Sequence, residues 1–199
     1  MRLILARHAE TIENLNNVNQ GQMNGSLTGI GRIQASHLGR RLSEEKIDIA
    51  FISDLRRCVQ TAEHILVHHP NIPVYYDRLL RERNLGVLQG SAYGEVAKHA
   101  EKSGVGLLDY KPKGGESINE MKLRVRQFID ALRENHTNKN ILIVSHGQYI
   151  ANIILYVLEL DDSNYESYKQ ENTAVSIIVY DEKPVLQLNN SLLHLDNNF

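Results

Sequence analysis

Cysteine, tryptophan and proline are scarce in this chain of 199 residues. It contains one cysteine, Cys58, no tryptophan and four prolines, which stand singly. One cysteine excludes an internal disulfide and a zinc site made of several cysteines. Neither sign of charge is in excess, because 22 Lys and Arg residues stand against 24 Asp and Glu residues and give a net charge of −2. With no basic arm and no acidic tail, we expect no nucleic-acid partner.

Long apolar runs are missing as well. No stretch approaches the roughly 20 apolar residues that a membrane-spanning helix needs, and the apolar N-terminus, residues 1–6, is too short for a secretory signal. Hydrophobic residues make up 42% of the chain, enough for an ordinary core. We expect a soluble, cytoplasmic protein without a membrane partner, folded as a single domain over residues 1–199.

Several motifs of other enzyme classes are absent. The sequence has no G-x-S-x-G serine elbow and no G-x-x-x-x-G-K-[ST] phosphate loop. His64 and His68 have the spacing of metal ligands on one helix face, but no H-E-x-x-H motif accompanies them and they can occupy a polar face. We therefore predict no metal site and no cofactor.

Short apolar runs predict the strands. Residues 2–6, 49–53 and 141–145 are too short for helices and are typical of strands buried on both faces of a parallel sheet. Residues 174–180 and 185–188 flank a turn and predict a terminal hairpin.

Helical patterns lie between these runs. Thr28 can cap a helix with an apolar stripe of Ile30, Ile33, Leu38 and Leu42. Asp54 can cap the next helix, and Ser117 and Glu120 form a capping box at the start of a third. A further helix is predicted over residues 148–158. Strands alternating with helices predict an α/β fold, a three-layer α/β/α sandwich with a mostly parallel central sheet.

Ligands of such sheets bind beyond the carboxyl ends of the strands. At those ends the sequence places Arg7 and His8, then Arg57, and then His146. Each group alone also fits an exposed loop. Together they suit a phosphate, because the arginine fork matches phosphate oxygens and stays charged.

The motifs around these residues resemble those of the histidine phosphatase superfamily, also called phosphoglycerate mutase-like. The run Arg7-His8-Ala9-Glu10-Thr11 is similar to the family's R-H-G-[EQ]-[ST] signature. Matching segments span nearly the whole chain in the family's order: residues 7–14, 21–35, 53–62, 80–90, 114–117 and 145–147. The pattern is most similar to that of the fructose-2,6-bisphosphatase type, and the resemblance implies the phosphoglycerate mutase-like fold.

The sequence departs from the family pattern at three positions. Ala9 replaces the glycine that follows the histidine in the family signature. The site should tolerate this change only if the φ angle of Ala9 is negative. Asn24 and Ser26 replace an Asp and a Pro in a loop that we expect to be structural.

The resemblance implies a mechanism through a phosphohistidine. His8 would attack phosphorus as a neutral imidazole, while Arg7, Arg57 and a protonated His146 would lower the pKa of His8 and hold the phosphate oxygens. Glu82 matches the general acid that protonates the leaving alcohol and then, ionised, activates water. The implied substrate contacts are Asn14, Gln20, Gly21, Gly147 and Gln148, although each of these also fits a turn or a strand-to-helix connection.

Three functions remain open. A phosphatase of sugar phosphates or related small phosphorylated metabolites is favoured. The cofactor-dependent phosphoglycerate mutases carry a lysine at the position of Tyr93 and a later Arg-Arg pair, which residues 107–112 lack, although Lys111 and Lys113 could partly substitute. A binding module that has lost activity is disfavoured because all the implied catalytic residues are present. The oligomeric state is also open, a homodimer being one option.

Overall fold

The computed structural model describes residues 1–195, so the last four residues of the expected domain lie outside the described part. One sheet holds β1 (Arg2–Arg7), β2 (Ile49–Ser53), β3 (Val74–Asp77), β4 (Asn140–Ser145), β5 (Val175–Tyr180) and β6 (Pro184–Ser191). The strand order is β3-β2-β4-β1-β5-β6, in which the first four strands are parallel and the hairpin β5–β6 joins β1 antiparallel. The predicted mostly parallel sheet is confirmed.

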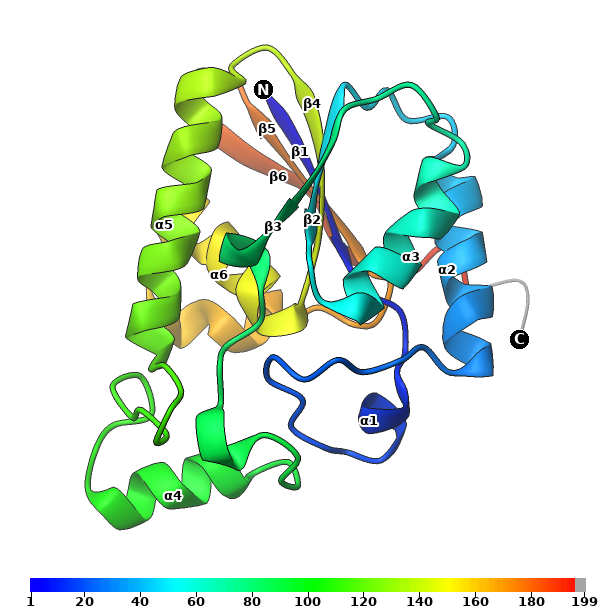
Figure 1. The fold of residues 1–199 in the computed structure, drawn as a ribbon. Helices are drawn as coiled ribbons and strands as arrows, with labels where there is room; N and C mark the ends of the chain where they lie inside the picture. The colour runs from blue at the N-terminus through cyan, green and yellow to red at the C-terminus, as the bar shows by residue number, and fades with distance from the viewer. Residues whose placement is uncertain (196–199) are drawn as a thin grey trace.

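Helices cover both faces of this sheet. The α-helices are α1 (Ile12–Leu15), α2 (Gly29–Leu42), α3 (Arg56–Leu66), α4 (Glu95–Ser103), α5 (Ile118–Asn135) and α6 (Gly147–Val157), and the 3-10 segments are η1 (Arg78–Leu80), η2 (Gly86–Leu88) and η3 (Asp162–Tyr168). Figure 1 shows α5 and α6 on one face and α2 and α3 on the other, which confirms the three layers. Among residues 1–195, no helix combines the length and the apolar composition needed to cross a bilayer.

Strand β1 explains why both faces must be covered. Its side chains alternate between the faces, so Leu3 and Leu5 pack with α5 and α6 while Ile4 and Ala6 pack with α2 and α3. All four are fully buried. The predicted strands at 2–6, 49–53 and 141–145 correspond to β1, β2 and β4 and are confirmed. The predicted terminal hairpin corresponds to β5 and β6 and is confirmed, with a second strand that is longer than expected.

The predicted apolar face of α2 is wrong in its first half. Ile30 and Ile33 are 51% and 48% exposed, whereas Leu38 and Leu42 are buried as expected. The helix instead buries Gly31 and Gly39, and a side-chain carbon on Gly31 would collide with the carbonyl of Glu10. Because the backbone of α2 lies against the Glu10 backbone at Gly31, Ile30 and Ile33 point toward solvent.

The predicted cap of α3 is also wrong. Leu55, which makes no side-chain cap bond, precedes the helix. The Asp54 carboxylate is taken by Arg81, whose Nε and Nη2 each donate to it over 2.6 Å. A two-pronged bond to an arginine outcompetes a helix N–H for the same oxygens. By contrast, the capping box of Ser117 and Glu120 on α5 is confirmed.

Strand register brings the expected site together. Arg7 pairs with Ser145 at the ends of β1 and β4, so the next residues, His8 and His146, are neighbours with ring centroids 5.3 Å apart. The long connection between β3 and α5, which carries α4, lies with α1 beyond this end of the sheet (Figure 1).

Candidate active site

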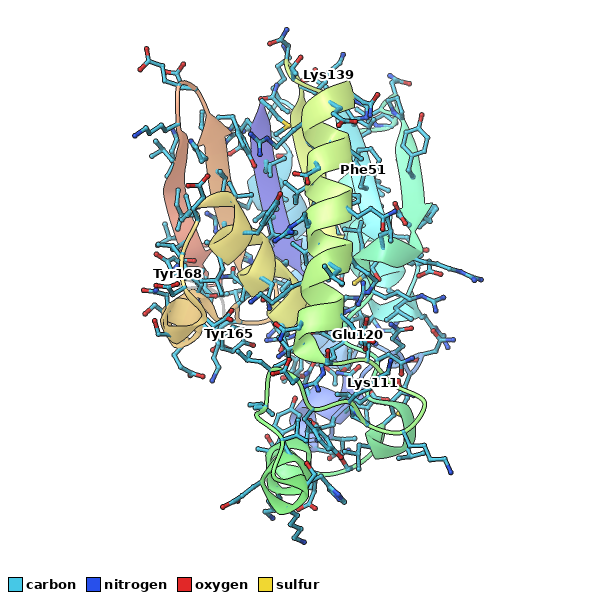
Figure 2. The ribbon with its side chains drawn as sticks, turned by 90° about the vertical axis from the view of Figure 1, so that its left-hand side faces the viewer. Phe51, Lys111, Glu120, Lys139, Tyr165 and Tyr168 are labelled. Atoms are coloured by element: carbon cyan, nitrogen blue, oxygen red, sulfur yellow. The ribbon has the colours of Figure 1, made fainter. Side chains whose placement is uncertain are left out.

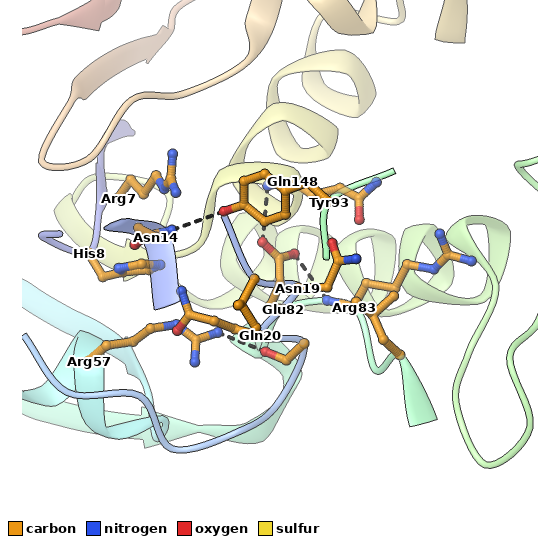
Figure 3. A pocket seen from close by; sticks show the side chains of 13 residues that line it. Arg7, His8, Asn14, Asn19, Gln20, Arg57, Glu82, Arg83, Tyr93 and Gln148 are labelled. Carbon is orange, nitrogen blue, oxygen red and sulfur yellow. Dashed lines mark hydrogen bonds between the residues drawn. The ribbon is translucent and has the colours of Figure 1, made fainter. Parts of the chain in front are cut away.

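A cavity of about 150 Å³ lies beyond the carboxyl ends of β1 and β4. Figure 3 shows Arg7, His8 and Arg57 on one side of it and Glu82, Asn19 and Tyr93 on the other. Its lining comes from separate parts of the chain: Arg7, His8, Asn14, Val18, Asn19, Gln20, Gly21, Arg57, Glu82, Arg83, Leu85, Tyr93 and Gln148.

His8 is held as a neutral imidazole with one free nitrogen. It is 3% exposed, and its Nδ1 lies 2.8 Å from the carbonyl oxygen of Ala9. Because a carbonyl only accepts, Nδ1 carries the proton and Nε2 keeps its lone pair. Burial, with the positive charges of Arg57 and Arg7, holds the pKa of His8 well below its ordinary value, as expected.

Ala9 fits beside His8 in the way that the sequence required. It is not among the residues with positive φ, its N–H donates to Thr61 Oγ1 over 2.9 Å, and its methyl group packs with Leu27 and Ala35. The replacement of glycine therefore causes no backbone strain at His8.

Arg7 has a buried side-chain donor without a hydrogen-bond partner in the described residues. Its Nη1 donates to the carbonyl of Gln170 over 2.6 Å, while its Nε is buried and has no hydrogen-bond partner within the described residues. Burial lowers the pKa of Arg7 from its ordinary value of 12.5, which leaves the group charged at neutral pH. An unpaired, buried cationic donor at the edge of a cavity suits an anionic oxygen.

Arg57 is fixed by three bonds. Its Nε donates to His146 Nδ1 over 3.2 Å, and its two terminal nitrogens donate to the carbonyls of Met23 and Gly21 over 2.7 and 2.8 Å. Since Nδ1 of His146 accepts, its Nε2 carries the proton of the neutral ring and donates to Ser53 Oγ over 2.8 Å.

The expected protonated state of His146 is wrong. The ring is fully buried, and burial together with Arg57 and His8 holds the pKa of His146 well below its ordinary value. The position of His146 at the end of a strand was predictable from the sequence. Its charge was not, because it depends on burial and on the Arg57 guanidinium, which α3 places against the ring. The arginines therefore supply the positive charge of this cavity.

Glu82 faces His8 across the cavity (Figure 3). Its carboxylate accepts the backbone N–H of Arg83 over 3.0 Å and that of Gln148 over 3.2 Å. The segment before it is held by Arg124 of α5, which donates to the carbonyls of Leu79 and Arg81. The acid is thus positioned by two backbone N–H groups and, through the segment before it, by the Arg124 side chain.

The predicted substrate contacts are mostly at the cavity. Asn14, Gln20, Gly21 and Gln148 line it, whereas Gly147 lines an adjoining cavity. Asn14 also fulfils its turn role, because its side chain and backbone form the capping box of α1 with Thr11. The turn role of Asn14 is confirmed, and the residue also lines the cavity.

Sequence reasoning missed several lining residues. Asn19 and Tyr93 reach the cavity because residues 17–19 pair with residues 90–93 through backbone hydrogen bonds. The Tyr93 hydroxyl accepts from Asn14 Nδ2 over 3.3 Å. The position of Tyr93 eleven residues after Glu82 was the available signal, whereas Asn19, Val18 and Leu85 had none.

Comparisons with known proteins agree with this geometry. A family model described as histidine phosphatase superfamily (branch 1) matches residues 3–191. The broad-specificity phosphatase YOR283W of Saccharomyces cerevisiae is 33% identical over 187 residues, 90% of this chain and 80% of that protein. Fructose-2,6-bisphosphatase TIGAR B of Danio rerio is 36% identical over 134 residues, 65% of this chain and 52% of that protein.

Solved structures add a relative with similar shape. The Entamoeba histolytica phosphoserine phosphatase, solved in complex with 3-phosphoglyceric acid, superposes with a TM-score of 0.83 at 30% identity over 98% of both chains. Because the family model matches nearly all of the described chain, this protein belongs to the histidine phosphatase superfamily, and its relatives include phosphatases.

Proposed function

We propose that this chain hydrolyses small phosphomonoesters through a phosphohistidine on His8. The observation that carries the proposal is the neutral His8 imidazole, with Nε2 free, flanked by Arg7 and Arg57 and opposite Glu82. A nucleophile, a fixed cationic cradle and a carboxyl group are the parts that stepwise phosphoryl transfer needs. In this proposal His146 positions Arg57, and Asn14, Gln20, Gly21, Gly147 and Gln148 contact the substrate.

In the first step His8 Nε2 forms a bond to phosphorus as the bond from phosphorus to the alcohol oxygen breaks. Glu82 gives its proton to that oxygen, so the product leaves as a neutral alcohol. The carbonyl of Ala9 holds the proton on Nδ1 of the phosphorylated ring. Arg7 and Arg57, both largely buried, stabilise the equatorial oxygens with charges that are already fixed in place.

In the second step the ionised Glu82 takes a proton from water as that water bonds to phosphorus. The bond from phosphorus to Nε2 breaks, which releases inorganic phosphate and restores neutral His8 and protonated Glu82. Every step uses side chains of this chain.

The mutase alternative has less support. Tyr93 lines the cavity at the position where the resemblance places a mutase lysine. Lys111 donates to Glu120 over 2.7 Å, and neither Lys111 nor Lys113 lines this cavity or the one beside it. The binding-module alternative is disfavoured because His8, Glu82 and both arginines stand together.

The test is hydrolysis of p-nitrophenyl phosphate in EDTA by three proteins. Wild type should turn over, His8→Ala should lose at least about 10³-fold because its nucleophile is gone, and His99→Ala, a change at an exposed residue of α4, should match wild type. Comparable activity in His8→Ala and wild type would contradict the proposal. A screen of phosphorylated metabolites with released phosphate measured then identifies the substrate.

A further inference from the structure

A second cavity, of about 440 Å³, opens beside the first. We call it the vestibule; its lining is Arg7, Asn19, Glu82, Tyr93, Gly147, Gln148, Tyr165, Lys169, Gln170 and Glu171. Half of these residues, Glu82 among them, also line the cavity around His8. If Glu82 protonates the leaving oxygen, as the proposed function requires, the rest of the leaving alcohol extends into the vestibule.

Uncharged hydrogen-bonding groups dominate the wall around Glu82. Tyr93 and Asn19 lie beside Glu82 (Figure 3), and Gln148 contributes the N–H that Glu82 accepts. Tyr165 comes from η3 and lies at the end of the sheet where α5 begins (Figure 2). Burial, with the charges of Glu82 and Glu166, raises the pKa of Tyr165, so its hydroxyl stays a neutral donor.

The cations at the vestibule are already engaged. The Lys169 ammonium pairs with the Glu166 carboxylate and lies 5.9 Å from the centre of the Tyr165 ring. Arg7, which lines both cavities, gives Nη1 to the carbonyl of Gln170, and its unpaired Nε, beside Gly147, is the donor that the proposed function assigns to the phosphate. Glu171 adds a negative charge. Apart from Arg7, which the proposed function assigns to the phosphate, the one cation of the described lining is Lys169, and it is paired.

From this composition we infer that the vestibule selects a neutral, polyhydroxylated leaving group, the alcohol part of a polyol or sugar monophosphate. Hydroxyl groups both donate and accept, so they can pair with tyrosine, asparagine and glutamine side chains. A carboxylate or a second phosphate on the leaving group would give up water without gaining a cation. Selection therefore acts against acidic leaving groups, and this inference rests on the proposed phosphatase function.

Two matched pairs of substrates test the inference. Glucitol 6-phosphate differs from 6-phosphogluconate, and glycerol 3-phosphate from 3-phosphoglycerate, only in a hydroxymethyl group that replaces a carboxylate. The wild-type ratio of kcat/KM, polyol over acid, should be about tenfold or more in each pair, the size of one unmade hydrogen bond to a charged group.

Tyr93→Lys places an ammonium in the vestibule and should shift both ratios toward the acid by about tenfold or more. Tyr76→Lys makes the same change at an exposed tyrosine of the edge strand β3, outside both cavities, and should leave the ratios at the wild-type value. The wild-type comparison decides the matter by itself if Tyr93→Lys does not fold.

A wild-type preference for either acid, or equal rates within both pairs, would overturn the inference. If p-nitrophenyl phosphate is hydrolysed in that case, the proposed function still stands. Failure to hydrolyse any phosphomonoester, including the aryl phosphate, would overturn the function and the inference together.

Discussion

The reactivity of His8 depends largely on its immediate neighbours in the sequence. The motif Arg7-His8 predicts a histidine near a cation, and the structure adds the Ala9 carbonyl that leaves Nε2 as the nucleophile. The same reasoning failed for His146, because burial and the Arg57 guanidinium, which comes from another part of the chain, keep its ring neutral. The sequence therefore predicted which histidines lie at the cavity. It predicted the protonation state of His8, whose neighbours Arg7 and Ala9 are adjacent in sequence, but not that of His146.

The buried histidines should make stability depend on pH. The folded-state pKa values of His8 and His146 lie well below the ordinary value of 6.5, and burial lowers that of His194 to about 4. Below pH 6.5 the unfolded chain binds these protons and the folded chain does not, so falling pH favours unfolding. His8 and His146 should each lower the free energy of unfolding by about 1 kcal/mol between pH 7.0 and 5.5, and the partly exposed His194 should lower it by less.

Urea unfolding at these two pH values measures that loss. The variant His8→Asn removes one of the three groups and should reduce the loss by about 1 kcal/mol. The variant His99→Asn, at an exposed position, should reproduce the wild-type loss. A loss in His8→Asn equal to that of wild type would show that His8 titrates alike in the folded and unfolded chains.

At the scale of elements, periodicity predicted the buried strands well and helix faces less well. Runs such as residues 3–6 are apolar at every position, as a strand buried between two helical layers requires. The face of α2 was mispredicted because Gly31 and Gly39 allow close backbone contact, which a pattern of hydrophobic residues does not reveal. The missed partner of Asp54 was Arg81, which reaches it from another segment.

Glycine packing on α2 gives a prediction with an internal control. A side-chain carbon on Gly39 would collide with the His64 carbonyl of α3, whereas one on Gly29 meets open space. Gly39→Ala should therefore lower the free energy of unfolding by ~1–3 kcal/mol, and Gly29→Ala should raise it by at most ~1 kcal/mol. Equal thermal unfolding midpoints for the two variants would contradict the packing described for α2.

At the scale of the whole molecule, the site is a product of topology. His8 follows β1, and Glu82 lies in the connection that leaves β3 and returns through α5. Sequence motifs predicted these residues and the edge of the sheet at which they meet. They did not predict α4 or the lining supplied by η3, because those segments carry no motif and their positions depend on contacts across the cavity.

The most direct test of the central claim is a rapid alkaline quench of Glu82→Gln during reaction with p-nitrophenyl phosphate. Nitrophenolate leaves without a proton, whereas hydrolysis of the phosphoenzyme needs the base, so the variant should show a burst of nitrophenolate and then a slow steady state. Peptide mapping of the quenched enzyme should place the phosphoryl group on His8, with a stoichiometry approaching one per chain. A burst without protein-bound phosphate, or a phosphoryl group on any other residue, would contradict the account.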